Sequence, residues 1–348
     1  SMAVATTPAP ATRLAVIGGG NMSEAIVGGL LGCGYPLDQC IVSEPTRARG
    51  EFLQNKYPGI QVLSGPNANH AAIQGCNASP KTAPTSEGSL FISPTAAAIG
   101  SRPADVVILA VKPQVLRPVL ADLGPLLRTH KPLVISIAAG VETEAIARFM
   151  TGEDPSIASS ELPPIIRVMP NTPSLVLEGA AGLYATPDAS ACQRQLAESI
   201  MSAVSKEVSW VEEEQLIDTV TGISGSGPAY FFLMMEAMEE AGVALGMDRE
   251  TARRLTIQTC LGAAKMAQSS PDDLRTLRVK VTSPQGTTDA AIKTFEAGGF
   301  RDLVKKSVTA ADHRSKSLAA ELGRPLATSP AATSDPNIVG AKEFSNKL

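Results

Sequence analysis

Several features that would define other classes of protein are missing from this chain. No apolar run approaches the roughly 20 residues of a membrane-crossing helix, so we expect no membrane span. The formal net charge is −4, and we expect no nucleic-acid partner because such a partner needs a basic surface. The three histidines, His70, His130 and His313, lie too far apart in the sequence to indicate a metal site, so we expect no metal.

Cysteine is also sparse, and the five residues form no CxxC pair. They are Cys33, Cys40, Cys76, Cys192 and Cys260. An odd, scattered set of this kind is typical of reduced thiols inside a cell. Residues 1–12 have neither the basic start nor the apolar core of a secretory signal. We therefore expect a cytoplasmic protein with a disordered leader over residues 1–12.

The first two thirds of the chain alternate between strand and helix patterns. Short apolar runs predict strands at 13–18, 40–45, 60–63, 104–111, 133–138 and 165–170. Helical periodicity lies between most of them, at 21–33, 46–57, 114–127 and 142–151. Such alternation predicts a parallel sheet with right-handed crossovers, and hence an α/β Rossmann-type domain over residues 13–212.

Two segments depart from this alternation. Residues 64–103 are rich in Ser, Pro, Gly, Asn and Thr, which predicts a flexible insertion, mostly at 75–103. After residue 212 only helical periodicity remains, at 228–246, 248–268, 287–297 and 301–322. These helices are apolar around much of their circumference, which predicts burial against a second copy of the chain.

The last third therefore predicts an all-α dimerisation domain over residues 213–322. Within it, SGSGP (224–228) predicts a turn between two helices. Gly246 predicts a helix stop, and Asp248 the N-cap of the next helix. The remaining residues, 323–348, are rich in Pro, Ser and Thr and predict a disordered tail.

A glycine triplet follows the first predicted strand and opens the first predicted helix. Gly18, Gly20 and Ser23 occupy the small positions of a GxGxxG/A dinucleotide loop. Gly18 permits the tight turn, and Gly20 allows the backbone to approach a pyrophosphate at the helix N-terminus. The alternative is a tight strand–helix turn without a ligand. The surrounding strand–helix–strand context favours a nicotinamide cofactor.

The end of the second strand gives conflicting signals about which cofactor binds. Glu44 is the acid that would hold the ribose 2′-OH of NAD. Ser43, Arg47 and Arg49 would instead form a pocket for the 2′-phosphate of NADP. The arginines are equally consistent with a solvated helix face. We favour NADPH, with NADH use still open.

Two further strand ends are expected at the same crevice, because ligands bind at the carboxyl ends of parallel strands. They are AVKPQ (110–114) and IAAG (137–140), whose small residues leave room for a ribose. Lys112 is either a ribose or nicotinamide contact or a solvated lysine. A separate helix start lies in VTSPQGTTDAAI (281–292), where unpaired N–H groups suit a second anion. The alternative is that Thr287 or Thr288 simply caps the helix.

Four blocks together carry a resemblance to the pyrroline-5-carboxylate reductase family. They are AVKPQ (110–114), VMPNTP (168–173), LIDTVTGISGSGPAYFF (216–232) and VTSPQGTTDAAI (281–292). The resemblance extends over about 13–322 without 64–103. It implies NAD(P)H-dependent reduction of 1-pyrroline-5-carboxylate to L-proline, the last step of proline biosynthesis. It also implies a Rossmann domain joined to a helical dimerisation domain, and so a homo-oligomer that is at least a dimer.

The resemblance also implies a role for individual residues. The cofactor pyrophosphate is assigned to Ile17, Gly18, Gly19, Gly20, Asn21 and Met22, and the adenosine ribose phosphate to Ser43. The nicotinamide side is assigned to Ala110, Val111, Lys112, Pro113, Ile137, Ala138 and Ala139. The small-molecule substrate is assigned to Glu214, Gly286, Thr287 and Thr288, with Thr288 as the catalytic residue. Either Asn67 or Asn69 would supply a contact on the adenosine side.

The substrate loop departs from the family pattern SPGG at Gln285. If that glycine needs positive φ, then Gln285 is strained or the loop differs. Lys280 adds a positive charge where a neutral amide is common. Residues 283–288 contain no His, Cys or carboxylate, so Thr288 is expected to position the imine nitrogen rather than to act as a strong acid.

Two other functions compete with this interpretation. One is a related hydroxy-acid dehydrogenase, but the helix predicted at 228–246 lacks the lysine or histidine that such enzymes place there. The other is an NADP-binding sensor or scaffold without turnover.

Overall fold

A computed structural model of the chain describes residues 12–65, 67–75, 91–92 and 102–325. A nine-stranded sheet with the order β4-β3-β2-β1-β5-β6-β7-β8-β9 forms its centre. The strands are β1 (Leu14–Ile17), β2 (Cys40–Ser43), β3 (Gln61–Ser64), β4 (Phe91–Ile92), β5 (Val106–Leu109), β6 (Leu133–Ser136), β7 (Ile165–Met169), β8 (Gly179–Ala185) and β9 (Ser205–Trp210).

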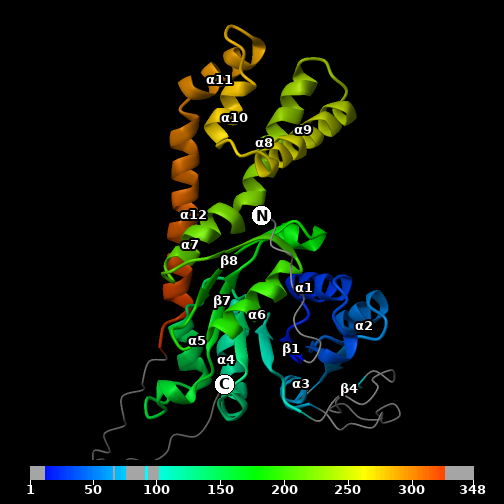
Figure 1. Cartoon of the computed structure of the whole chain (residues 1–348), viewed down its shortest axis with the longest axis vertical. Helices are drawn as coiled ribbons and strands as arrows, with labels where there is room; N and C mark the ends of the chain where they lie inside the picture. The colour runs from blue at the N-terminus through cyan, green and yellow to red at the C-terminus, as the bar shows by residue number, and fades with distance from the viewer. Residues whose placement is uncertain (1–11, 66, 76–90, 93–101, 326–348) are drawn as a thin grey trace, which may run out of the picture.

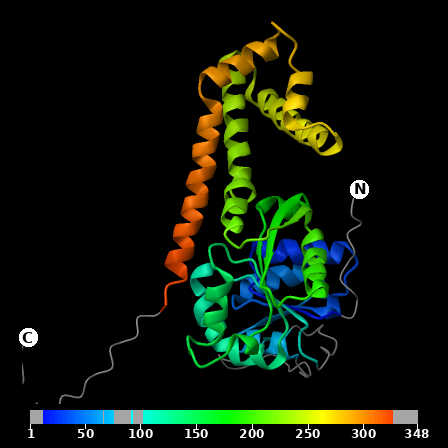
Figure 2. The ribbon, with the colours of Figure 1, turned by 60° about the vertical axis from the view of Figure 1, so that its left-hand side comes forward.

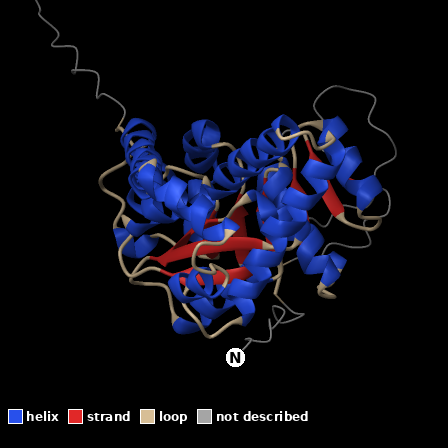
Figure 3. Cartoon of the chain, turned by 90° about the horizontal axis from the view of Figure 1, so that it is seen from above, coloured by secondary structure: helices blue, strands red, loops and turns tan. Residues whose placement is uncertain are grey.

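Helices cover both faces of this sheet (Figure 3). Leu14 and Val16 of β1 belong to one apolar cluster, and Ala15 and Ile17 to the other, because successive strand residues point to opposite faces. The first cluster includes residues of α1 (Asn21–Gly32), α2 (Arg47–Lys56) and α6 (Ala191–Ser202). The second includes residues of α3 (Ala68–Gln74), α4 (Pro113–His130) and α5 (Thr143–Met150). All four residues of β1 are inaccessible to solvent, which explains the uninterrupted apolar run.

The sheet is not wholly parallel, and the prediction is wrong on this point. β8 runs antiparallel to β7, with Val168 opposite Leu183, and β4 runs antiparallel to β3. Residues 170–178 join β7 to β8 and hold only a short 3₁₀ helix, η3 (Thr172–Val176). A parallel crossover needs about a dozen residues or more, so this connection is too short for one.

Helix α3 and strand β4 lie inside the segment predicted as a flexible insertion, which corrects that prediction at both places. Ala72 and Ile73 of α3 are buried, and their burial fixes this helix against the sheet. The remainder of 76–101 lies outside the described residues. So do residues 1–11 of the predicted leader and residues 326–348 of the predicted tail.

The last third of the chain is helical, as predicted. It contains α7 (Leu216–Val220), α8 (Gly227–Ala244), α9 (Arg249–Ser269), α10 (Leu274–Lys280), α11 (Thr287–Ala297) and α12 (Phe300–Leu322). Asp248 caps α9 by accepting the N–H of Thr251 at 2.9 Å, and Gly246 has φ +98°, so both boundary predictions are confirmed.

The predicted turn at SGSGP is wrong. Residues Thr221–Gly225 form a π-helical segment, η4, and Ser226 keeps helical dihedral angles, so α7 continues into α8 without a turn. A π-helical insertion of this kind bends a helix and is common at functional sites. Gly222 and Gly225 permit it, because a Cβ on Gly222 would lie 3.0 Å from Val308 O.

Helices α8 and α12 both lead away from the sheet, and α10 and α11 lie at the far end of the helical domain (Figures 1 and 2). The lower end of α12 returns to the sheet domain. There Gly140, with φ +69°, approaches Leu318 so closely that a Cβ would lie 3.3 Å from its side chain.

Candidate functional site

The glycine loop between β1 and α1 is fixed by its neighbours. Gly18 has φ +104°, and a Cβ on it would lie 2.8 Å from Ala110 O, so glycine is required twice over. Its N–H donates to Ser43 O at 2.8 Å. A Cβ on Gly19 would lie 2.8 Å from Glu44 Oε2. The loop is therefore held against the ends of β2 and β5.

Gly20 differs from the two glycines before it. It is the N-cap of α1, no side chain caps this helix start, and a Cβ on Gly20 would meet nothing within 4 Å. Gly20 and Asn21 are exposed, and Met22 is half-buried. An uncapped helix N-terminus facing open space has the shape and partial positive charge to receive a phosphate. The loop therefore fits a dinucleotide pyrophosphate.

Glu44, the acid proposed for NAD, is already engaged. Its Oε2 accepts the N–H of Gly19 at 2.8 Å, and its Oε1 accepts the N–H of Thr46 at 2.7 Å. It is also buried. Glu44 thus stabilises the glycine loop, and its burial leaves little of the carboxylate accessible to a ribose.

Arg49 is likewise committed to the loop. Its Nε donates to Gly19 O at 2.6 Å, and its Nη2 pairs with Glu24 at the same distance. Burial opposes the ionisation of Glu24, but hydrogen bonds from Lys56 and Arg49 outweigh it, so the pKa of Glu24 lies below its ordinary value. Arg47 differs, because its exposed side chain makes an exposed ion pair with Glu51.

Ser43 and Asn69 lie together at the end of β2. The Ser43 hydroxyl donates to Asn69 Oδ1 at 2.6 Å, and Ser43 is buried. Asn67 is exposed and has φ +65°, just before α3. Of the two asparagines considered for the adenosine side, Asn69 is the one beside Ser43.

The structure brings together the strand ends predicted for the nicotinamide side. Ala110 N–H donates to Ile17 O at 2.9 Å, and Ile137 N–H donates to Leu109 O at 3.1 Å. These bonds align the ends of β1, β5 and β6 in one row. Lys112 is exposed at the N-cap of α4, and Pro113 is the first residue of that helix. Val111 is half-buried, Ala138 is buried and Ala139 is exposed.

The second anion loop precedes α11. Gln285 has φ +60°, and Gly286 N–H donates to Ser283 O at 3.0 Å, as in a type II turn with Pro284 at its second position. Gln285 therefore adopts the positive φ that was considered for the glycine of the family pattern, and the loop keeps that conformation without a glycine. The N–H of Gln285 donates to Asp289 Oδ2 at 3.1 Å, which helps to hold the glutamine in this conformation.

Gly286, and neither threonine, is the N-cap of α11, so the alternative of a plain threonine cap is wrong. Thr287 and Thr288 are exposed, and within the described residues neither hydroxyl makes a hydrogen bond. Gly286 N–H is used in the turn, which leaves the N–H groups of the two threonines for an anion. Lys280 pairs with Asp272 at 2.5 Å, within its own helical region.

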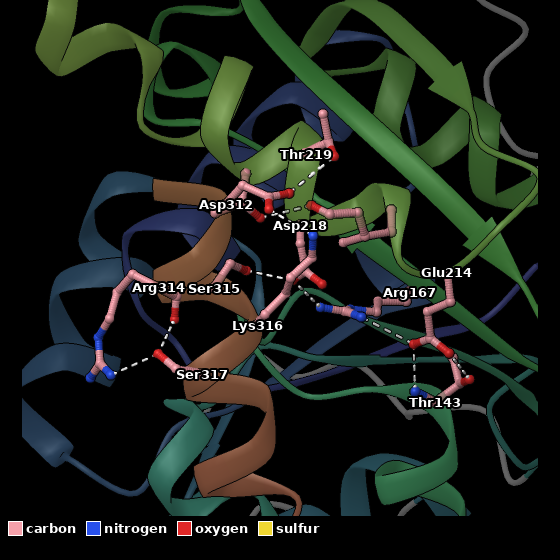
Figure 4. A network of polar contacts seen from close by, with 12 residues as sticks. Thr143, Arg167, Glu214, Asp218, Thr219, Asp312, Arg314, Ser315, Lys316 and Ser317 are labelled. Atoms are coloured by element: carbon pink, nitrogen blue, oxygen red, sulfur yellow. Dashed lines mark hydrogen bonds and ion pairs between the residues drawn. The ribbon is translucent and has the colours of Figure 1, made fainter. Parts of the chain in front are cut away.

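Glu214 lies before α7 and binds the start of α5 (Figure 4). Its Oε1 accepts hydrogen bonds from Thr143 N–H at 2.7 Å and from Arg167 Nη1 at 3.1 Å. Its Oε2 accepts the hydroxyl of Thr143 at 2.6 Å. Both carboxylate oxygens are therefore engaged within the chain, next to the loop 137–142.

Sequence reasoning missed two residues that organise this region. Arg167 of β7 is 2% exposed and lies between Glu214 and Asp218. Asn171 accepts the N–H of Ala180 at 2.9 Å and donates to Ser224 O at 3.1 Å. A charged residue inside the apolar run IIRVM was the available signal for Arg167. Asn171 lies in the block VMPNTP, but its two partners, 9 and 53 residues later, could not be read from that block.

The two anion loops are far apart within one chain. The glycine loop lies at the sheet, whereas α11 lies at the opposite end of the helical domain (Figures 1 and 2). Among the described residues, no group of three or more His, Cys, Asp or Glu side chains is placed to hold a metal ion. No described helix is both long and apolar enough to cross a membrane.

Comparisons with known proteins agree with this arrangement. Residues 214–318 match the family model "Pyrroline-5-carboxylate reductase dimerisation", and residues 13–140 match "NADP oxidoreductase coenzyme F420-dependent". The pyrroline-5-carboxylate reductase of Pseudomonas aeruginosa is 41% identical over 312 residues, which cover 90% of this chain and 98% of that protein. That of Haemophilus influenzae is 40% identical over 306 residues, covering 88% and 97%.

A solved structure gives the same result for the fold. The pyrroline-5-carboxylate reductase of Coxiella burnetii matches with a TM-score of 0.73 at 38% identity, covering 90% of this chain and 99% of that one. Identity at this level over nearly the full length of each relative exceeds what a shared fold alone requires. The chain therefore belongs to the pyrroline-5-carboxylate reductase family.

Proposed function

We propose that this protein reduces 1-pyrroline-5-carboxylate to L-proline with a reduced nicotinamide cofactor, as the last step of proline biosynthesis. The observation that carries the proposal is the pairing of two uncapped helix starts in one chain, at α1 and α11. One suits a dinucleotide phosphate and the other a substrate carboxylate. The family relation specifies the carboxylate, because the relatives are named for this substrate.

The cofactor would lie along the row of strand ends. The N–H groups at the start of α1 would hold its pyrophosphate beside Gly20, where a Cβ would meet open space. Ala110 to Pro113 and Ile137 to Ala139 would line the nicotinamide. When bound, this group supplies the hydride, and the chain supplies position and exclusion of water.

The substrate loop would do two things. The N–H groups of Thr287 and Thr288 would take the substrate carboxylate, since Gly286 N–H is used in its turn. The Thr288 hydroxyl, which has no partner among the described residues, would hydrogen-bond the imine nitrogen. A hydroxyl is a weak acid, so Thr288 would orient this nitrogen, and its proton would come with the substrate or from water. Glu214 would border the site indirectly by fixing Thr143.

The working site would combine two copies of the chain. Phe231, Phe232 and Leu233 of α8 are 62%, 64% and 66% exposed, and Leu245 is 90% exposed. Apolar surface of this extent is typical of a subunit interface. Because α11 lies far from its own glycine loop, a homodimer through the helical domain would bring it to the crevice of the other copy.

We also propose a preference for NADPH over NADH. Arg47 begins α2, four residues after Ser43, and its side chain is exposed in an ion pair with Glu51, whereas Arg49 is tied to Gly19 and Glu24. The exposed pair with Glu51 contributes only about 0.5 kcal/mol, as surface pairs of this kind do, so it would compete weakly with a 2′-phosphate. Arg47→Ala should raise KM for NADPH about tenfold and leave KM for NADH unchanged. Equal effects on both would contradict a phosphate contact by Arg47.

One assay tests the activity itself. NADPH oxidation should be rapid with pyrroline-5-carboxylate and negligible with a panel of keto acids. Binding of NADPH without turnover of any of them would instead support a sensor or scaffold.

The compartment proposed for this reaction is the cytoplasm. Among the described residues, Cys40, Cys192 and Cys260 form no disulfide, which is typical of a reducing compartment. Cell fractionation of the native source tests this assignment.

A further inference from the structure

A buried arginine connects the two domains. Arg167 comes from β7 of the sheet domain, and its guanidinium faces Glu214 at 3.1 Å and Asp218 at 3.7 Å. Both carboxylates belong to the beginning of the helical domain. Arg167 and Asp218 are each 2% exposed. A charge buried to this degree depends on its partners, because loss of one partner leaves the other uncompensated.

The same cluster holds the start of α5. Glu214 accepts both the backbone N–H and the hydroxyl of Thr143, the first residue of that helix. A carboxylate at a helix N-terminus is favoured by the unpaired N–H groups there. Residue 140 precedes Thr143 by three positions, so Glu214 holds the start of the helix that follows the strand end proposed for the nicotinamide.

The cluster reaches the last helix as well (Figure 4). The hydroxyl of Ser315 on α12 donates a hydrogen bond to Asp218 Oδ1 at 2.6 Å, and both residues are buried. One turn earlier, Asp312 accepts from Thr219 at 3.1 Å and pairs with Lys316 at 2.7 Å. The sheet-facing ends of α7 and α12, called their roots below and marked by Asp218 and Ser315, are thus joined to each other and to Arg167.

The substrate loop, residues 283–288, lies at the far end of the helical domain from these two roots (Figure 1). From Ser315 to Phe300, α12 extends for about 22 Å at 1.5 Å per residue. A rotation of about 5° at the root would therefore move the far end by roughly 2 Å. A misplacement of about 1 Å between reacting groups can lower a rate by about a hundredfold. A small change in the angle at which α12 leaves the sheet domain would consequently change the position of the substrate loop enough to alter the rate.

We propose that Arg167 is a positioning residue for the reductase reaction, which sets the angle between the sheet domain and the helical domain by holding Glu214 and Asp218 together. The proposal rests on the function proposed above. Arg167 touches neither substrate nor cofactor. It acts through Glu214, Asp218 and the roots of α7 and α12, and its loss changes where the loop 283–288 lies relative to the cofactor crevice.

Arg167→Met tests this in the full-length protein, because methionine fills similar space without the charge. We expect kcat for pyrroline-5-carboxylate to fall at least thirtyfold, while the Kd for NADPH, measured by fluorescence titration, stays within threefold. Assays are run at least 15 °C below the Tm of each variant. Arg167→Lys should give an intermediate kcat, because one ammonium group cannot bridge two carboxylates as a guanidinium does.

Arg128→Met is the matched control. Arg128 lies on α4 and donates to Met150 O, so it joins elements of the sheet domain only. It should lower Tm without lowering kcat. If Arg167→Met and Arg128→Met lower kcat equally, Arg167 is only structural and the proposal fails. If Arg167→Met does not fold, Arg167→Lys decides, and a wild-type kcat in that variant overturns the proposal.

Small-angle X-ray scattering separates this proposal from the proposed function. The scattering profile of folded Arg167→Met, or of Arg167→Lys, should differ from that of wild type, because the angle between the domains changes. This result is expected even if the wild-type protein fails to reduce pyrroline-5-carboxylate, in which case only the proposed function is wrong. An unchanged profile together with an unchanged kcat overturns the role of Arg167.

Discussion

The sheet domain and the helical domain use the same apolar residue types with opposite results. In the sheet domain every residue of β1 is inaccessible, and two apolar clusters fill the space on either side. In the helical domain Phe232 is 64% exposed and Leu245 is 90% exposed. The first domain completes its core within one chain, whereas the second presents half of an interface.

The two anion loops also differ in whether distant parts of the same chain hold them in place. Close approach to Ala110 and Glu44, both from other parts of the sheet domain, fixes the glycine loop. In the part of the chain that the structure describes, the hydrogen bonds that hold the loop before α11 are local, from Gly286 N–H to Ser283 O and from Gln285 N–H to Asp289. A second chain is therefore expected to matter for the substrate loop and not for the cofactor loop.

The largest effect should follow from a charge placed on the exposed apolar face. Phe232→Glu should prevent dimer formation and remove nearly all turnover, because a buried unpaired carboxylate costs several kcal/mol. NADPH binding should persist in the sheet domain. Sedimentation and fluorescence titration measure the two properties. Gln195→Glu, which adds the same charge at an exposed position of α6, should change neither property. An active monomeric Phe232→Glu variant would contradict the comparison.

A charge in the glycine loop should have the converse effect. Gly20→Glu fills the space open to a phosphate and adds a like charge, so NADPH affinity should fall at least about a hundredfold. The dimer and Tm should be retained, because a Cβ at this position meets nothing within 4 Å. Gly32→Glu, at the other end of α1 and equally open, is the control. Normal NADPH binding by Gly20→Glu would place the cofactor elsewhere.

The substrate loop should respond by a smaller factor. Thr288→Ala removes one hydrogen bond to the imine nitrogen, and kcat/KM for pyrroline-5-carboxylate should fall about 10–100-fold with NADPH affinity intact. Thr294→Ala on the same helix loses only a bond to Ala290 O and serves as control. A loss of many orders of magnitude would indicate proton donation by Thr288.

The smallest effect is expected where the two domains meet. Burial, together with the charge of Glu214, raises the pKa of Glu142 above its ordinary value of 4.5. Ionised Glu142 therefore costs stability above the folded-state pKa, and this cost disappears as pH falls towards 4.5. Glu142→Gln should raise Tm at pH 8 by no more than about 3 °C and have no effect near pH 4.

The exposed neighbour Glu144 supplies the control for that measurement. Glu144→Gln removes a favourable charge from the first turn of α5 and should lower Tm slightly at pH 8. Stabilisation by Glu142→Gln at pH 4 as well as pH 8 would show that its charge is not the cause.

Local pattern predicted much of the fold. The apolar runs located β1, β2, β5, β6 and β7, and Asp248 and Gly246 marked the boundary between α8 and α9. The small residues of β8, GAAGLYA, gave no strand signal. The direction of β8 depends on the short connection at 170–178, and the sequence pattern did not show where that connection ends. The sequence predicts a turn at 224–228 because serine and glycine favour turns, but Thr221–Gly225 form a π-helical segment packed against α12, and the helix continues.

The candidate site divides in the same way. The roles of Gly18 and Gly20 could be predicted because they follow from backbone geometry at neighbouring residues, whereas the sequence left open whether Gln285 takes a positive φ or the loop differs. The commitment of Glu44 to Gly19 and of Arg49 to Glu24 could not, since each bond joins residues 25 positions apart. The pairing of Arg167 with Glu214 could not be predicted for the same reason, because these residues lie 47 positions apart.

The sequence alone determined the order of elements, the two helix starts suited to anions and the apolar helices that need a partner. These properties depend on residue type and on spacing within a few turns. The tertiary structure decided which charged side chains stabilise the fold through internal contacts and which remain accessible to a ligand. It also showed that the two anion loops lie far apart in space within one chain, one at the sheet and the other at the far end of the helical domain. Such outcomes depend on contacts between distant segments, whose geometry no local pattern contains.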